Sequence, residues 1–264
     1  MHLNLYVKQG YSGWGKSGSL RCDIRMPSPW SQSQYGFVQL EWKHFQPLGK
    51  SFLRLRTLAY LGGGNNPTPE SVLYLASANP EDAFSQQPLY RDYGMLDLVS
   101  SRPINTLQVN GGLNLRGFNG YSAPKTVKQA NGTDTTLAFF RGNQGLGVNA
   151  AIDLTPFFRW VPKTKFISIN PYLFGDAGII GQPLTSPNKQ QQLVTQQVYS
   201  RLLADAGIGF STNLKNASAL TKNKALKAAK PLNLRIDFPL WVNAVQNNNN
   251  YLQFRWRLSI GTDF

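Results

Sequence analysis

The last fourteen residues of the chain alternate between two series of side chains with a period of two. The first series is almost entirely apolar and the second is almost entirely polar: Leu252, Phe254, Trp256, Leu258, Ile260, Thr262 and Phe264 against Tyr251, Gln253, Arg255, Arg257, Ser259, Gly261 and Asp263. A helix would spread the apolar series around its whole circumference, whereas successive side chains of a strand point to opposite faces. The pattern therefore predicts a long β-strand with one apolar and one polar face.

The same alternation recurs along the chain and predicts nine strands in all. It is clear in residues 19–26, 53–61 and 232–243, and weaker versions occupy residues 2–9, 35–45, 137–156, 166–180 and 200–213. No segment of comparable length has the periodicity of an amphipathic helix. We therefore expect an all-β, antiparallel fold for one domain spanning residues 1–264.

Strand length separates the two classes of all-β protein that this pattern allows. Most of the predicted strands have about 9–14 residues, whereas strands of soluble proteins have about 5–6 and a tilted strand that crosses a bilayer needs about 9–11. The sequence has no run of 18 apolar residues, which excludes a transmembrane helix but leaves a transmembrane β-barrel open. Length favours the barrel; a soluble β-sandwich is the alternative, because it alternates in the same way.

The polar faces of the predicted strands carry both signs of charge. They hold eight arginines and seven acidic residues, which can pair across a polar interior as well as on a solvated surface. The net charge of +14 lies mostly outside the strands, and residues 215–230 contain five lysines and no acidic residue. Such a segment can meet phosphate groups of lipid or nucleic acid, or can be a solvated turn.

No motif of the chain indicates catalysis or metal binding. The single cysteine, Cys22, excludes Cys-based zinc sites, and His2 and His44 are the only imidazoles. Residues 10–17, GYSGWGKS, match the phosphate-loop pattern, but their flanks alternate as strands and no helix follows, so we interpret them as a hairpin turn. We expect no catalytic residue, no metal, no cofactor and no enzymatic activity in this chain.

Two segments between residues 112 and 178 resemble motifs of the outer-membrane assembly-factor superfamily, also called the bacterial surface antigen family. One resembles its R-G-[FY] loop motif, and the other, residues 174–178, resembles its F-x-D-x-G strand motif. The residues that match are Arg116, Gly117, Phe118, Phe174, Asp176 and Gly178. Both segments occur in the order and spacing of the family.

The end of the chain adds two further points of resemblance. Residues 231–238 are similar to the penultimate strand of the family, and the last strand ends in Phe264, like the C-terminal assembly signal of bacterial outer-membrane barrels. Phe254 and Trp256 lie on the same face of that strand as Phe264. The resemblance covers residues 105–264, and the first hundred residues share only the strand pattern.

The resemblance implies a 16-stranded transmembrane barrel in the bacterial outer membrane, with the loop before the last five strands folded into the lumen. Five predicted strands follow Thr136 and four precede Gly62, so we expect the chain to be the C-terminal part of such a barrel, with residues 62–136 as the long lumen loop. The N-terminus has no signal peptide, and the periplasmic repeats of the family are absent. An N-terminal remainder of the same protein is therefore expected.

Three functions follow from these observations. The resemblance favours a module related to the insertion of barrel proteins into the outer membrane or to polypeptide translocation across it, with membrane lipid, client barrel proteins and accessory assembly factors as partners. The alternative is a barrel that serves as anchor or exit pore for an upstream peptidase-like or lipase-like enzyme. A soluble, basic nucleic-acid binder fits less well, because the strand aromatics and the arginines lie on opposite faces, so we expect no nucleic-acid partner.

One contact can be predicted from these motifs and from physical chemistry. Asp176 lies on the polar face of its strand, and Arg116 lies in a polar, glycine-rich loop. A guanidinium brought into a barrel interior needs a carboxylate, carbonyl or water as partner. We therefore expect Arg116 near Asp176, with Gly117 allowing a close approach and Phe118 packed against the same wall.

Overall fold

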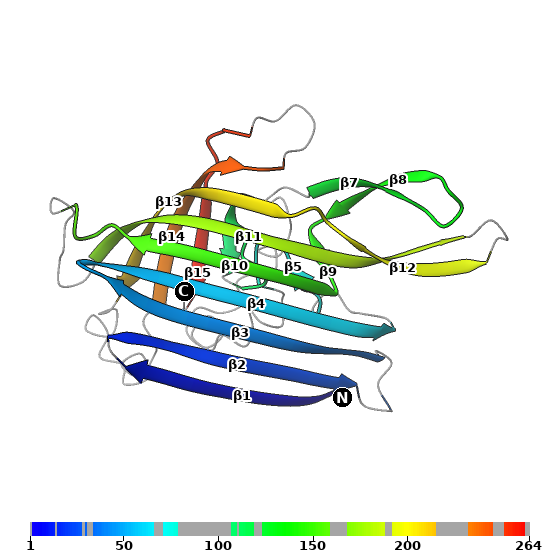
Figure 1. Cartoon of the computed structure of the whole chain (residues 1–264), viewed down its shortest axis with the longest axis horizontal. Coiled ribbons are helices and arrows are strands. Elements are labelled where there is room, and N and C mark those ends of the chain that lie inside the picture. The colour runs from blue at the N-terminus through cyan, green and yellow to red at the C-terminus, as the bar shows by residue number, and fades with distance from the viewer. Residues whose placement is uncertain are drawn as a thin grey trace.

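One large curved sheet organises the chain, as the two-faced strands predict (Figure 1). The computed structural model describes residues 2–13, 15–27, 30, 34–65, 71–78, 107–109, 111–118, 123–158, 168–187, 192–214, 232–244 and 251–261. The sheet has eleven strands. They are β1 (His2–Gly13), β2 (Lys16–Pro27), β3 (Gln34–Leu48), β4 (Ser51–Asn65), β6 (Leu107–Val109), β10 (Gln144–Asp153), β11 (Ser168–Pro187), β12 (Leu193–Tyr199), β13 (Leu203–Leu214), β14 (Leu232–Val242) and β15 (Arg257–Gly261).

The strands pair mostly in chain order. Within the described residues, the path runs β1-β2-β3-β4-β10-β11-β13-β14-β15-β6, and β12 pairs with the second half of β11. Every pair in this sheet is antiparallel except β15 with β6. The nine strands expected from the sequence are therefore confirmed, in the expected order, as β1 to β4, β10, β11, β13, β14 and β15.

Short elements lie in the long segment between β4 and β10. They are β5 (Leu73–Tyr74), which pairs with β9 (Arg141–Gly142), β7 (Ala123–Lys128), which pairs with β8 (Asp134–Phe139), and the 3-10 helix η2 (Arg116–Phe118). The segment expected as one loop over residues 62–136 thus begins after Asn65 and contains its own small strands. Within the described residues, no helix is long and apolar enough to span a bilayer.

Two strand predictions need correction. Residues 137–156 form the end of β8, then β9 and β10, because the chain leaves its course after Phe139 to let Arg141–Gly142 pair with β5. The long C-terminal strand is also shorter than its alternation suggests: residues 251–256 contribute a single bridge, from Leu252 to Trp241, and β15 begins at Arg257. The GYSGWGKS segment is confirmed as part of the β1–β2 hairpin.

The two faces of the sheet have an unusual distribution of polarity. The face that carries the apolar side chains, here called the outer face, is exposed; its most exposed members include Leu5, Leu40, Leu61 and Val148. The opposite face, here called the inner face, is polar yet buried. Its buried residues include Glu41, Arg56, Asn149, Asp176, Asp205, Arg235, Asp237, Arg257 and Ser259.

The apolar core of the molecule lies between the inner face and the segment that covers it. Leu73, Leu75, Leu113, Leu115 and Phe118 of that segment are buried, and they cluster with strand residues of the inner face. The strand members of the cluster are Leu58, Tyr60, Ile180, Leu203 and Val242. The segment 111–118 is thereby held against the wall formed by the sheet.

The ends of the strands differ in how they are joined. The hairpins β1–β2 and β3–β4 turn tightly at one end, between Gly13 and Lys16 and between Leu48 and Ser51. Register pairing places the last described residue of β15 at this same end, which we call the tight-turn end. The long segment that contains β5 to β9 leaves β4 and enters β10 at the opposite end.

Candidate functional site

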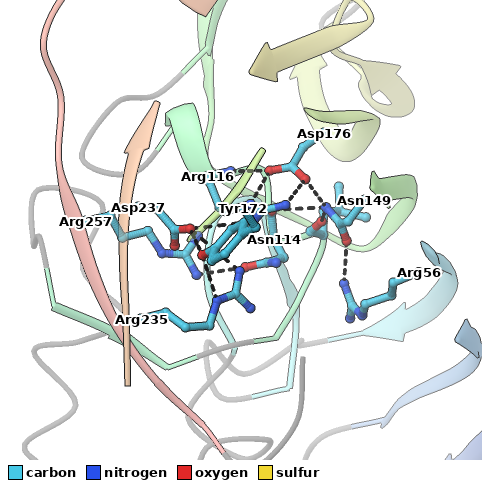
Figure 2. A network of polar contacts seen from close by, with 10 residues as sticks. Arg56, Asn114, Arg116, Asn149, Tyr172, Asp176, Arg235, Asp237 and Arg257 are labelled. Carbon is cyan, nitrogen blue, oxygen red and sulfur yellow. Dashed lines mark hydrogen bonds and ion pairs between the residues drawn. The ribbon is translucent and has the colours of Figure 1, made fainter. Parts of the chain in front are cut away.

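The predicted pairing of Arg116 with Asp176 is present (Figure 2). Nε of Arg116 donates to Oδ2 of Asp176 at 2.8 Å, and Nη2 donates to Oδ1 at 2.8 Å, so the two planar groups form a bidentate pair. The backbone N–H of Arg116 also donates to Oδ2, at 3.2 Å. Three donors of one loop residue thus converge on one carboxylate of β11, which is among the stronger hydrogen-bond arrangements a protein offers.

The surroundings of Arg116 keep its guanidinium buried and charged. Its side chain is fully buried, and the guanidinium carbon lies 3.9 Å from the centre of the Phe174 ring. Nη1 lies 3.5 Å from Oδ1 of Asp237. Burial alone would lower the pKa of Arg116, but the nearby carboxylates of Asp176 and Asp237 raise it above its usual value. The guanidinium of Arg116 therefore keeps its positive charge at this site.

The other predicted motif residues provide space and packing around this pair. A Cβ on Gly117 would lie 2.6 Å from the Cβ of Asp205 and 2.6 Å from Val242, so only glycine lets the loop lie this close to the wall. Phe118 is buried in the apolar core, and η2 contacts β13 and β14. Gly178 faces the loop as well, since a Cβ there would lie 3.4 Å from Leu115.

Asn149 of β10 joins the pair to the rest of the inner face, a role that no sequence motif predicts. Its amide nitrogen donates to Oδ1 of Asp176 and to the carbonyls of Leu113 and Asn114, at 3.0 to 3.2 Å. Its amide oxygen accepts from Nη1 of Arg56 at 3.0 Å. Arg56 in turn donates to Glu41 and to the carbonyl of Gly112.

A second group of polar residues lies on the other side of Arg116, on β14 and β15. Nη2 of Arg257 donates to Oδ1 of Asn114 at 2.8 Å, so the last strand is bonded to the loop. The Tyr172 hydroxyl donates to Asp237, and Arg235 donates to that same hydroxyl at 3.1 Å. Figure 2 shows these side chains converging from β4, β10, β11, β14 and β15 on segment 111–118.

Asp205 is the exception within this network. It pairs directly with Asp176 across β11 and β13 and is 2% exposed, but neither of its carboxylate oxygens is hydrogen-bonded within the described part of the chain. Two neighbouring buried carboxylates repel each other when both are charged. Arg116 donates its hydrogen bonds to Asp176 rather than to the adjacent carboxylate of Asp205.

The predicted C-terminal residues are not part of this network. Phe254 is 69% and Trp256 is 49% exposed, on the outer face, while Arg255 and Arg257 are buried. Phe264 lies outside the described residues. The alternation of buried and exposed side chains therefore holds from Phe254 to Ser259, although 251–256 are not in a strand, whereas residues 251–254 are all exposed.

The arrangement holds the loop of residues 111–118 in place against the wall. In the described part of the chain, no group of three or more His, Cys, Asp or Glu side chains could hold a metal ion. No family model, curated protein or solved structure matches the chain.

Proposed function

We propose that the chain is a transmembrane β-barrel module of the bacterial outer membrane. The observation that carries the proposal is the polarity of the sheet, whose exposed face is apolar and whose buried face is charged. A soluble β-sandwich buries its apolar faces against each other, whereas a membrane barrel presents them to lipid and encloses a polar interior.

The position of the apolar band on successive strands supports this reading. On β1 the exposed apolar series is centred on Leu5, which lies in register with Leu61 of β4. On β14 the exposed apolar side chains run from Ile236 to Trp241, and the middle of this stretch, Phe238, lies in register with Leu53 of β4. The band therefore shifts toward the tight-turn end as it crosses the sheet.

The size of this shift agrees with tilted strands in a bilayer. From the row of Leu61 to the row of Leu53 is eight residues, over the seven steps from β1 to β14. With a rise of about 3.3 Å per residue and a strand spacing of about 4.8 Å, this corresponds to a tilt of about 40°. Strands of outer-membrane barrels tilt by about 35–45°. An apolar belt that stays at one level of the bilayer would therefore shift along successive strands in this way.

The finer architecture is also part of the proposal. The nine strands β1 to β4, β10, β11, β13, β14 and β15 form a contiguous part of a larger closed barrel, 16-stranded as the family resemblance implies, and segment 111–118 lies in its lumen. Outer-membrane lipid surrounds the outer face. The buried arginines support this arrangement over a nucleic-acid platform, because Arg116, Arg235 and Arg257 are 0% exposed and cannot reach a phosphate backbone.

The proposed activity is assistance in the insertion of barrel proteins into the outer membrane or in polypeptide translocation across it. Its support is the loop of the Arg116 motif, bound to the wall through Asp176 and to the last strand through Arg257. A plug tied to both elements couples its own position to that of the final strands. Client barrel proteins and accessory assembly factors are the partners this activity requires.

The test reconstitutes the full chain in phosphatidylcholine vesicles. Protection from added protease establishes insertion, and the vesicles are then mixed with a small urea-unfolded outer-membrane barrel whose folding is followed by its change in gel mobility. We expect the client to fold severalfold faster than in empty vesicles, and we expect Asp176→Asn to reduce the acceleration.

The outcomes separate the two parts of the proposal. A chain that stays soluble and fully protease-sensitive with vesicles would refute the membrane barrel. Insertion without any acceleration would refute the assembly activity and favour a barrel that anchors, or forms the exit pore of, an upstream enzyme.

A further inference from the structure

A polar aromatic cluster occupies the outer face near the tight-turn end. Nε1 of Trp42 donates to the hydroxyl of Tyr11 at 2.9 Å, and that hydroxyl is hydrogen-bonded to Nδ1 of His44 at 2.7 Å. The Trp42 and His44 rings stack with centroids 5.3 Å apart, and those of Tyr11 and His44 are 5.9 Å apart. We call these residues the Tyr11–Trp42–His44 cluster.

The cluster lies where the exposed apolar series ends. On β1 the outer series is apolar as far as Val7 and continues with Gln9 and Tyr11; on β3 it is apolar through Leu40 and continues with the cluster. Gly18 of β2 pairs with both Tyr11 and His44, and a Cβ there would overlap the Tyr11 ring. The glycine lets the aromatic rings of the two flanking strands meet across β2.

Positive charge is concentrated at the same end of the sheet. Lys16 and Lys50 are exposed in the two tight turns, which adjoin each other, since a Cβ on Gly15 would lie 3.4 Å from Pro47. The connections β10–β11 and β13–β14 start and finish at this end, and their sequences hold eight lysines and arginines and no acidic residue. Residues 66–143, which join strands at the other end, hold six acidic and six basic residues.

We propose that this end of the outer face binds the headgroup of an anionic phospholipid. The inference rests on the proposed membrane barrel. Aromatic rings with a polar edge favour the level where hydrocarbon meets headgroup, and lysines beside them attract lipid phosphates. The cluster contacts the glycerol and ester region, and Lys16 and Lys50 contact the phosphate.

The test titrates the full chain, purified in a neutral detergent, with phosphatidylglycerol or phosphatidylcholine and counts bound lipids by native mass spectrometry. We expect tighter binding of phosphatidylglycerol. Lys16→Gln and Lys50→Gln should each weaken that binding about fivefold, the effect of one lysine near an anionic surface. Lys128→Gln, an exposed lysine on β7 at the other end, should leave it unchanged.

Three results would overturn the inference: equal binding of the two lipids, an equal loss with Lys128→Gln, or displacement of the lipid by inorganic phosphate at equal concentration. The last would mean that the surface binds phosphate without regard to lipid. Insertion into phosphatidylcholine vesicles, measured separately, reports on the barrel proposal alone, so the two failures are distinguishable.

Discussion

Asp176 receives three donors from Arg116, and this concentration of contacts makes it the residue on which the loop depends most. Asp176→Asn leaves a fully buried guanidinium without its carboxylate, and breaking a buried pair in this way costs about 3–5 kcal/mol. We expect the free energy of unfolding to fall by that amount, measured by urea denaturation of the protein in lipid vesicles. An unchanged midpoint would show that the loop is held by its apolar contacts alone.

Asp205 gives the matched control, because it is equally buried and directly opposite Asp176. Nε and Nη2 of Arg116 donate to Asp176 rather than to Asp205, so Asp205→Asn leaves the bidentate pair intact. We expect the same urea experiment to give an equal or higher free energy of unfolding. A loss as large as that of Asp176→Asn would identify Asp205 as a second counter-ion of the loop.

At the scale of the strand, alternation along the sequence predicts which side chains share a face of the sheet. It predicts less well which residues pair with a neighbouring strand. The nine strands expected from the sequence were predictable because the alternation of each keeps its parity over many residues. The final segment shows the limit: Arg255 is buried and Trp256 exposed, as parity requires, yet 251–256 are not in a strand. The short strands β6, β7 and β12 were missed, and β8 and β9 were merged with β10, because a few residues do not establish a period.

The same limit applies to the site. Arg116 and Asp176 could be paired from sequence because each lies in a recognisable motif and a buried charge needs a partner. Asn149 could not be predicted, since an asparagine on a polar strand face has no distinctive spacing and its role depends on carbonyls of the loop. Arg257 was assigned to the correct face, but its partner Asn114 becomes a neighbour only through the fold.

The last strand carries a prediction of its own. Phe264 continues the outer apolar series and resembles a terminal assembly signal, so its deletion should reduce the yield of protein in the outer membrane. Stability of the protein once folded should change little, because the alternation assigns Phe264 to the face opposite the network at Arg257. Yield is compared by membrane fractionation with and without Phe264, and an equal yield would remove the assembly-signal interpretation.

At the scale of the whole molecule, the charged inner face and the apolar outer face both result from the alternation of polar and apolar side chains along the strands. The loop of residues 111–118 neutralises part of the inner face, where Arg56, Arg116, Arg235 and Arg257 lie among Glu41, Asp176, Asp205 and Asp237. The outer face has no comparable cover among the described residues, and its apolar band follows the diagonal expected for tilted strands. The central claim is that this outer face is surrounded by lipid.

The most direct test of this claim places a charge at two exposed apolar positions of different depth. Val148 is 43% exposed near the centre of the band on β10, and Leu48 is 47% exposed at the tight-turn end of β3. In vesicles, Val148→Arg should lower the free energy of unfolding by about 2–4 kcal/mol and Leu48→Arg by about 0–1 kcal/mol. If Val148→Arg lowers the free energy of unfolding no more than Leu48→Arg, as expected at a water-exposed surface, then the outer face does not contact lipid and the proposed membrane barrel is refuted.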